Sequence, residues 1–325
     1  MSNILNYIEE NPKETQRFIG LEYEQLQHLI KNAEQLNQEK QALRESKKVR
    51  IIAGGGGRKP KLSEKEQIIL TLVYLRHLTT FQLLGIQFGV SESTANNIFN
   101  YWLPILRELL PSSLIEQVKK TESDYEIVKE ILTDYELIVD SYEQVRERPG
   151  DNEEQEKYFS GKKSNHTFKS QIIIMPDGRD IVDVVAGEPG PKSDITLFRE
   201  NRDTFDSKQS FKGDLGYIGE DLIDTPIKKP RNKELTTDQK KSNKEFSSKR
   251  IFVEHRIRSV KIFRVVQDRF RLNPKKYEQV ILTICGESAL REGFPPQATA
   301  NPKGLVRLRI RALILPLELS TISSC

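Results

Sequence analysis

The sequence is poor in cysteine and in long apolar runs. Its 325 residues include two cysteines, Cys285 and Cys325, and no CxxC pair, which excludes a disulfide framework and a thiolate zinc site. No apolar run reaches the roughly 18 residues needed to span a bilayer, because arginines interrupt the apolar C-terminal stretch. The N-terminus also has neither the basic region nor the apolar region of a secretory signal. We therefore expect a protein with no membrane span, in a reducing, cytoplasmic setting.

Several catalytic and ligand-binding motifs are also absent. The four histidines are not spaced as a zinc-binding pair. Serine, histidine and aspartate occur without a nucleophile elbow, so acyl transfer has no support. Residues 54–57 are all glycine, but no glycine precedes Lys59 or Lys61 in the register that a phosphate-binding P-loop requires. The glycine run therefore predicts a flexible joint.

Charge is nearly balanced over the whole chain but very uneven along it. The 51 lysines and arginines and the 47 acidic residues give a net charge of +4. Residues 116–156 hold 14 acidic and 5 basic residues, whereas residues 227–276 hold 17 basic and 5 acidic residues. Such a concentration of positive charge predicts a surface that binds a polyanion, and a solvated helix face is the alternative.

Glycine, proline and apolar spacing divide the chain into segments. Residues 1–53 have apolar positions three and four residues apart, which predicts an N-terminal helical arm. Residues 54–61 form a glycine-rich basic linker, and a helical domain follows over residues 62–118. From residue 130 to 286, short apolar runs alternate with turn signals and helical stretches, which predicts an α/β domain.

The helical domain has the layout of a helix-turn-helix. A helix over residues 80–88 ends at Gly89, and Ser91 is placed to cap the next helix. The inward stripe of that next helix consists of Ala95, Ile98 and Trp102. Its opposite face carries small polar side chains, which are Ser93, Asn96, Asn97 and Asn100. Asparagine can pair with the edge of an adenine, so this face predicts reading of a DNA major groove; a plain three-helix bundle is the alternative.

Two predicted strands carry an acidic residue at or near their ends. The apolar run 137–139 leads to Asp140, and a second strand leads to Asp214 beside a glycine-rich loop. A carboxylate at the end of a buried strand is unfavourable unless it is paired or binds a cation. Two such acids side by side, with Glu254 from a basic helix, therefore predict a site for Mg²⁺. Each acid alone could instead be a helix cap or a salt-bridge partner.

Several different short motifs follow one another between residue 55 and residue 270. They are Gly-Arg-Lys-Pro-Lys-Leu at 57–62, Val-Asp at 139–140, Tyr-Phe-Ser-Gly-Lys-Lys at 158–163 with His166-Thr167, Gly-Glu-Pro-Gly at 187–190 with Ser193-Asp194-Ile195, Gly-Asp-Leu-Gly-Tyr at 213–217, and Val-Glu-His at 253–255 followed by Lys261. In number and order they resemble the motifs of DDE transposases of bacterial insertion sequences related to the Harbinger group. The resemblance covers most of the chain.

This resemblance implies an α/β fold, with an RNase H-like catalytic domain (a mixed sheet flanked by helices) preceded by an all-α helix-turn-helix domain. By direct motif match it implies that Asp140, Asp214 and Glu254 are catalytic and hold the metal, as two Mg²⁺ or Mn²⁺ ions. It implies double-stranded DNA as the partner, assembly as a homo-oligomer on that DNA, and association with the nucleoid. The residues that we expect to contact DNA are Ser93, Asn96, Asn97, Asn100, Arg58, Lys59, Lys61, Arg258 and Lys261.

The chain departs from the family pattern after Gly286. The family motif Leu-Val-Arg-Leu-Arg follows only at 305–309, so residues 287–304 indicate an insertion and residues 305–325 the remainder of the closing helix. The insertion holds two consecutive prolines, which would break a helix there.

Together these features predict a transposase that binds terminal inverted repeats and catalyses metal-dependent DNA strand cleavage and strand transfer. One alternative is a decayed, catalytically impaired copy that acts at most as a DNA-binding protein. Another is a host nuclease built on the same fold.

Overall fold

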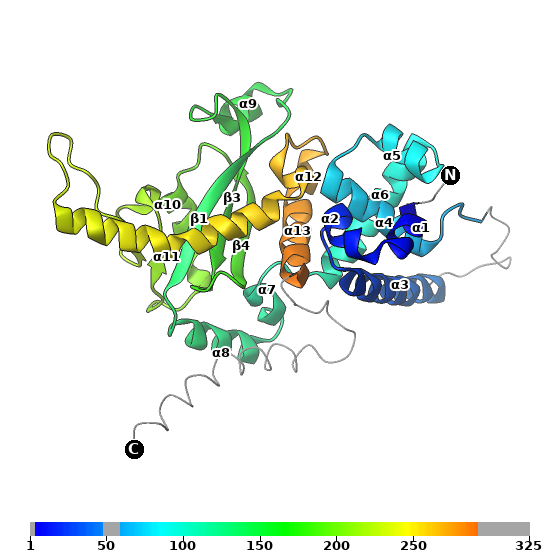
Figure 1. Cartoon of the computed structure of the whole chain (residues 1–325), viewed down its shortest axis with the longest axis horizontal. Helices are drawn as coiled ribbons and strands as arrows, with labels where there is room; N and C mark the ends of the chain where they lie inside the picture. The colour runs from blue at the N-terminus through cyan, green and yellow to red at the C-terminus, as the bar shows by residue number, and fades with distance from the viewer. Residues whose placement is uncertain (1–3, 48–58, 292–325) are drawn as a thin grey trace, which may run out of the picture.

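The computed structural model describes residues 4–47 and 59–291. Within them the chain forms a helical part and an α/β part, with helix α13 (Tyr277–Arg291) between the two (Figure 1). No helix in these two stretches is both long enough and apolar enough to cross a membrane. A helical region followed by a mixed α/β region is the architecture that the sequence predicts.

The N-terminal segment is helical, as its apolar spacing predicts. Its helices are α1 (Ile4–Glu10), α2 (Thr15–Ile19) and α3 (Tyr23–Ser46), with a 3₁₀ turn η1 (Pro12–Glu14) before α2. The buried apolar face of α3 consists of Leu26, Leu29, Ile30 and Ala33. Helix α3 packs on α4 (Glu64–His77) and α6 (Glu92–Leu109), so this segment lies against the next helices rather than extending away from them.

Helix α5 (Phe81–Phe88) and helix α6 form the helix-turn-helix. Helix α5 ends at Gly89, whose φ of +67° is a left-handed conformation that glycine adopts without strain. The Ser91 hydroxyl then accepts a hydrogen bond from the backbone N–H of Thr94 at 3.2 Å and starts α6, as predicted. The predicted inward stripe of α6 is buried and consists of Ala95, Ile98 and Trp102.

A mixed sheet forms the centre of the α/β part. Its strands are β1 (Leu137–Val145), β2 (Phe159–Ser160), β3 (Asn165–Ile174), β4 (Ile181–Pro189), β5 (Phe211–Lys212) and β6 (Ile223–Asp224). Strand β1 lies between β3, to which it is antiparallel, and β5, to which it is parallel. Strands β2 and β4 pair antiparallel with β3, and β6 pairs parallel with β5. This order confirms the predicted RNase H-like fold class.

Helices cover both faces of the sheet. They are α7 (Leu114–Val118), α8 (Glu122–Leu132), α9 (Asn152–Tyr158), α10 (Asp194–Asn201), α11 (Thr237–Lys261), α12 (Arg264–Gln267) and α13. Because side chains alternate along a strand, Ile138 belongs to a core with α11, α12 and α13, whereas Leu137 and Val139 belong to a core with α7, α8 and α10. Figure 1 shows α11 as one long helix that runs across the sheet.

Helix α13 contacts β4 on one side and α6 on the other, and it continues past the predicted interruption. The first residues of the predicted insertion, Glu287 to Arg291, are helical, and Glu287 to Leu290 are buried. Helix α13 therefore continues through the first five residues of the predicted insertion, and the insertion over residues 287–304 remains a prediction. Residues 292–304 and 305–325 lie outside the described residues.

Candidate active site

Strands β1 and β5 bring two of the predicted acids together. The strands are parallel, and Ile138 aligns with Lys212. The same register, continued by two residues on each strand, places Asp140 beside Asp214. Asp214 follows the end of β5, as predicted. Asp140 lies within β1 rather than at its end, because β1 continues its pairing with β3 beyond this residue.

Asp140 is a partly buried carboxylate beside Arg250 of α11. Its Oδ1 accepts a hydrogen bond from the backbone N–H of Ser141 at 2.8 Å, and Arg250 Nη2 on α11 lies 3.4 Å from its Oδ2. The pKa of Asp140 is raised to about 6, chiefly by burial and also by the negative charges of Asp214 and Asp194. Arg250 and the Ser141 N–H act in the opposite direction on this pKa. Three carboxylates from separate elements therefore lie within electrostatic reach of one another.

Asp214 and Asp194 lie on either side of Gly216. Asp214 Oδ1 accepts a hydrogen bond from the Gly216 backbone N–H at 2.8 Å and caps the turn η3 (Leu215–Tyr217). A Cβ atom built on Gly216 would lie 2.8 Å from Asp194 Oδ2 and 2.9 Å from Asp214 Oδ1. Both distances are too short for a side chain, so glycine keeps the space between the two carboxylates open. No function was predicted for Asp194, although the Ser193-Asp194-Ile195 motif is a signal that points to it.

Glu254 is exposed on α11, and the structure does not bring it to the other two acids. Among the residues that the structure describes, no three His, Cys, Asp or Glu side chains lie close enough to hold a metal ion. Arg250 and Lys261 lie four residues before and seven residues after Glu254, on the same helix face. Both reach β1, Arg250 at Asp140 and Lys261 Nζ at 4.7 Å from the centre of the Tyr142 ring. Glu254 thus lies on the face of α11 that approaches β1, although its side chain remains exposed.

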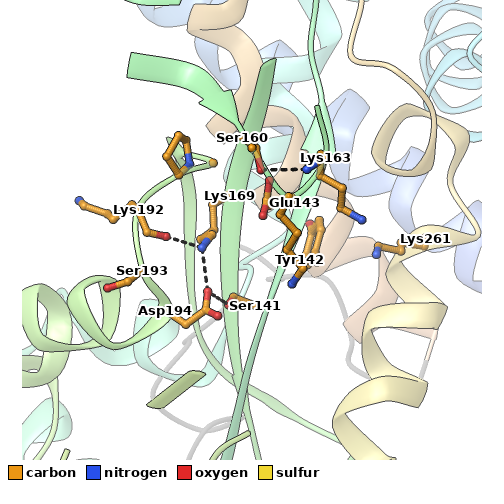
Figure 2. Close-up of a pocket in the computed structure, with 14 residues that line it drawn as sticks. Ser141, Tyr142, Glu143, Ser160, Lys163, Lys169, Lys192, Ser193, Asp194 and Lys261 are labelled. Atoms are coloured by element: carbon orange, nitrogen blue, oxygen red, sulfur yellow. Dashed lines mark hydrogen bonds and ion pairs between the residues drawn. The ribbon is translucent and has the colours of Figure 1, made fainter. Parts of the chain in front are cut away.

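A lysine-rich cleft of about 500 Å³ opens beside the acids, and Figure 2 shows the side chains that line it. Lys169 Nζ donates a hydrogen bond to Asp194 Oδ1 at 2.9 Å and another to the backbone carbonyl of Lys192. The Ser141 hydroxyl donates to the same Asp194 oxygen. This network fixes Asp194 between the cleft and the acid pair. The sequence analysis did not identify the cleft, because its walls come from segments far apart in the chain.

The predicted DNA-reading face of α6 is largely free of contacts with the rest of the fold. Ser93, Asn96 and Asn97 are exposed, as expected for a surface that meets a partner. Asn100 is half-buried: its amide donates to Asn96 Oδ1 at 3.0 Å, and its own oxygen accepts a hydrogen bond from Lys276 at 2.5 Å. Asn100 therefore also ties α6 to the α/β part of the chain.

The basic residues predicted to contact DNA have different surroundings. Lys61 Nζ donates to the backbone carbonyl of Gly89, the residue that ends α5. Lys59 and Arg258 are exposed. Lys261 is half-buried over the Tyr142 ring and lines the lysine-rich cleft. Arg58 lies outside the described residues.

Comparisons with known proteins agree with this arrangement. Residues 139–286 match the family model described as DDE superfamily endonuclease, and residues 60–112 match the helix-turn-helix of DDE superfamily endonuclease. Over 229 residues the chain is 31% identical to the probable transposase for insertion sequence element IS702 of Microchaete diplosiphon, a match that covers 68% of this chain and 78% of that protein. No significant match to a solved structure was found. The placement near the Harbinger group remains a prediction. The chain belongs to the DDE superfamily endonucleases, as an insertion-sequence transposase with a helix-turn-helix before its catalytic domain.

Proposed function

We propose that this transposase binds the terminal inverted repeats of its element through α6, cuts the DNA there and joins the freed 3′-hydroxyl to target DNA. The observation that carries the catalytic part is the parallel register of β1 and β5, which sets Asp140 beside Asp214. Two carboxylates so placed repel each other unless a cation lies between them. The binding part is supported by the exposed polar face of α6.

The acids of this site suit a divalent cation, the kind of ion that DDE endonucleases use. We assign two Mg²⁺ or Mn²⁺ ions to Asp140, Asp214 and Glu254. When bound, such ions polarise the phosphoryl oxygens and stabilise the attacking and leaving oxygens of an in-line displacement. Arg250 supplies the positive charge next to Asp140 in this structure, so its release from Asp140 would accompany cation binding.

The chain's own groups would set the orientation of these acids. The Ser141 N–H holds Asp140 Oδ1, and the Gly216 N–H holds Asp214 Oδ1. Each acid therefore keeps one oxygen fixed by the backbone and has a second oxygen for the cation. Glu254 would complete the set by turning from solvent toward β1 when DNA and cation are present.

Two other surfaces would bind the DNA and position it at the acids. In this proposal α6 reads base edges in the major groove, and the basic block at residues 227–276 follows the phosphate backbone. We expect two or more copies of the chain to assemble on the transposon ends, because two ends must be cut and joined together. The protein would act at the nucleoid.

A buried acid without a hydrogen-bond partner in the described residues favours a second candidate, a copy that binds DNA but cleaves it poorly. Glu287 is fully buried in α13, and neither of its carboxylate oxygens has a hydrogen-bond partner within the described residues. The match to the endonuclease family model ends at Gly286, directly before it. An uncompensated acid here would loosen the contacts of α13 with β4 and α6. A displacement of catalytic groups by about 1 Å can lower the rate on the order of 100-fold.

A plasmid in which the element's two terminal repeats flank a marker tests the proposed function. The purified full-length chain should excise the marker in Mg²⁺ and not in EDTA, and only when both repeats are present. Repeat binding without cleavage would favour the impaired copy. Cleavage that ignores the repeats would indicate the host nuclease and contradict the proposal.

A further inference from the structure

Three separate segments place ammonium groups around the lysine-rich cleft. Lys162 and Lys163 come from the turn between β2 and β3, Lys192 from the loop before α10, and Lys261 from the end of α11 (Figure 2). Lys169, within β3, lines the inner side of the cleft. The cleft is thus surrounded by cations from elements that only the folded chain brings together.

Five lysines line the cleft, against two acids, Glu143 and Asp194. Lys169 and Lys192 form ion pairs with acids of β4 and α10. Lys162, Lys163 and Lys261 form no ion pair within residues 4–47 and 59–291. Burial and the charge of Lys163 lower the pKa of Lys261, whereas the charge of Asp140 raises it, so Lys163 and Lys261 lie close enough to repel each other. An anion in the cleft would remove that repulsion.

The cleft has a fixed wall and lies beside the acid pair. A Cβ atom on Gly190 would lie 1.7 Å from Thr167 Oγ1, so the loop that carries Lys192 packs directly on β3 and glycine is required there. Ser141 and Asp194 line the cleft, and Ser141 directly follows Asp140 in β1. An extended polyanion that passes the acid pair would therefore continue into the cleft.

We propose that this cleft binds the phosphate backbone of the DNA strand presented to Asp140 and Asp214, through Lys162 and Lys163 of the turn between β2 and β3 and Lys261 at the end of α11. The inference rests on the proposed function and adds a binding site to it. Phosphate contacts of this kind position a strand without reading its sequence. The cleft thus holds the strand in place for the acids, while α6 supplies the choice of site.

The test compares two double variants of the full-length chain in EDTA, where no cutting occurs. Lys162→Gln with Lys163→Gln removes two cleft charges; Lys119→Gln with Lys120→Gln removes two exposed charges that follow α7 and do not line the cleft. Affinity is measured by fluorescence anisotropy over a range of salt, on a terminal-repeat duplex and on a random-sequence duplex. Acetylation of single lysines with and without DNA, read by mass spectrometry, reports the same contacts in the unmutated chain.

We expect the cleft variant to bind both duplexes roughly tenfold or more weakly, with the salt slope reduced by about 0.9 for each lost phosphate contact. Its preference for the repeat should stay, which shows that α6 is folded, and DNA should protect Lys162 and Lys163 from acetylation. A cleft variant that matches the control, or cleft lysines that DNA leaves reactive, would overturn this inference alone. An unmutated chain that binds neither duplex would overturn the proposed function as well.

Discussion

Asp140 on β1 and Asp183 on β4 are partly buried acids of the same sheet, and burial raises the pKa of each to about 6. Their surroundings differ. Asp183 aligns with Ile173 of β3, whose side chain belongs to the core with α7 and α8. There the charge of Lys119 lowers its pKa and that of Glu116 raises it. Within the described residues, Asp183 belongs to no cluster of acids that could hold a metal ion, and its partner on β3 is the apolar Ile173.

Asp140, in contrast, lies close to charged side chains from several other elements. Asp214 comes from the parallel neighbour β5, Asp194 from α10, and Arg250 from α11, and the lysine-rich cleft opens beside them. A raised pKa alone therefore does not identify a catalytic acid, because burial raises the pKa of both Asp140 and Asp183. Several carboxylates from separate elements, next to lysines that form no ion pair within the described residues, distinguish the candidate active site.

The largest effect outside β1 is expected from Glu254→Gln on α11, which removes the charge of the third proposed ligand. DNA cleavage should fall about 100-fold or more, because metal ligation is worth several kcal/mol in the transition state. DNA binding should not change. Glu245→Gln, at another exposed position of α11, is the matched control and should cleave like the unmutated chain. Equal cleavage by the Glu254 and Glu245 variants would remove Glu254 from the site.

Glu287 is a buried acid of a third kind: within the described part of the chain it has no hydrogen-bond partner and belongs to no cluster of acids. Its effect should appear in stability. Burial raises its pKa from 4.5 to about 8, although the charge of Arg76 lowers it. The folded state therefore holds this proton more tightly than the unfolded state does. The contribution to stability is fully present below about pH 4.5 and is lost as the pH rises through about 8. That loss should be on the order of 2–5 kcal/mol.

Chemical denaturation of Glu287→Gln at several pH values checks this expectation. The variant should lack the stability loss between pH 5 and pH 8 that the unmutated chain shows, and the two curves should diverge as pH rises. Glu278→Gln, on the exposed side of the same helix, should follow the unmutated chain. Parallel curves for the Glu287 variant and the unmutated chain would show that this acid is compensated, and would weaken the impaired-copy candidate.

The smallest effects should come from substitutions on the uncharged, polar face of α6, and they should appear in the choice of DNA sequence. Asn97→Ala should reduce the preference for the terminal repeat over random DNA by about 1–3 kcal/mol, the value of one bidentate base contact. Asn100→Ala should reduce it less, because Asn96 and Lys276 already engage the Asn100 side chain. Competition binding with the two duplexes measures both. A larger loss for Asn100→Ala than for Asn97→Ala would indicate that Asn100, rather than Asn97, makes the base contact.

Much of this could be predicted from the sequence because the signals are local. The cap at Ser91, the stop at Gly89 and the stripe on α6 depend on neighbouring residues and appear as expected. The acids Asp140 and Asp214 followed from short apolar runs, and the strand register then placed them together.

The remaining features of the site depend on tertiary packing, which the spacing of residues along the sequence does not determine. Arg250 meets Asp140 only because α11 crosses the sheet, and Asp194 approaches Asp214 only because Gly216 leaves room between them. The continuation of α13 through Glu287 was not predicted, because the family motif resumes only at 305–309 and residues 287–304 were therefore assigned to an insertion. Glu254 was placed in the site by motif alone, and its side chain remains exposed in the structure.

The most direct test of the central claim is a cleavage assay on the two-repeat plasmid with Asp140→Asn and Asp183→Asn. Both changes remove a partly buried acid with a pKa raised to about 6 from the same sheet. We predict that the Asp140 variant binds the terminal repeat normally but gives no Mg²⁺-dependent cleavage, while the Asp183 variant cleaves like the unmutated chain. Cleavage by the Asp140 variant at the unmutated rate, or equal loss in both variants, would contradict the assignment of this site.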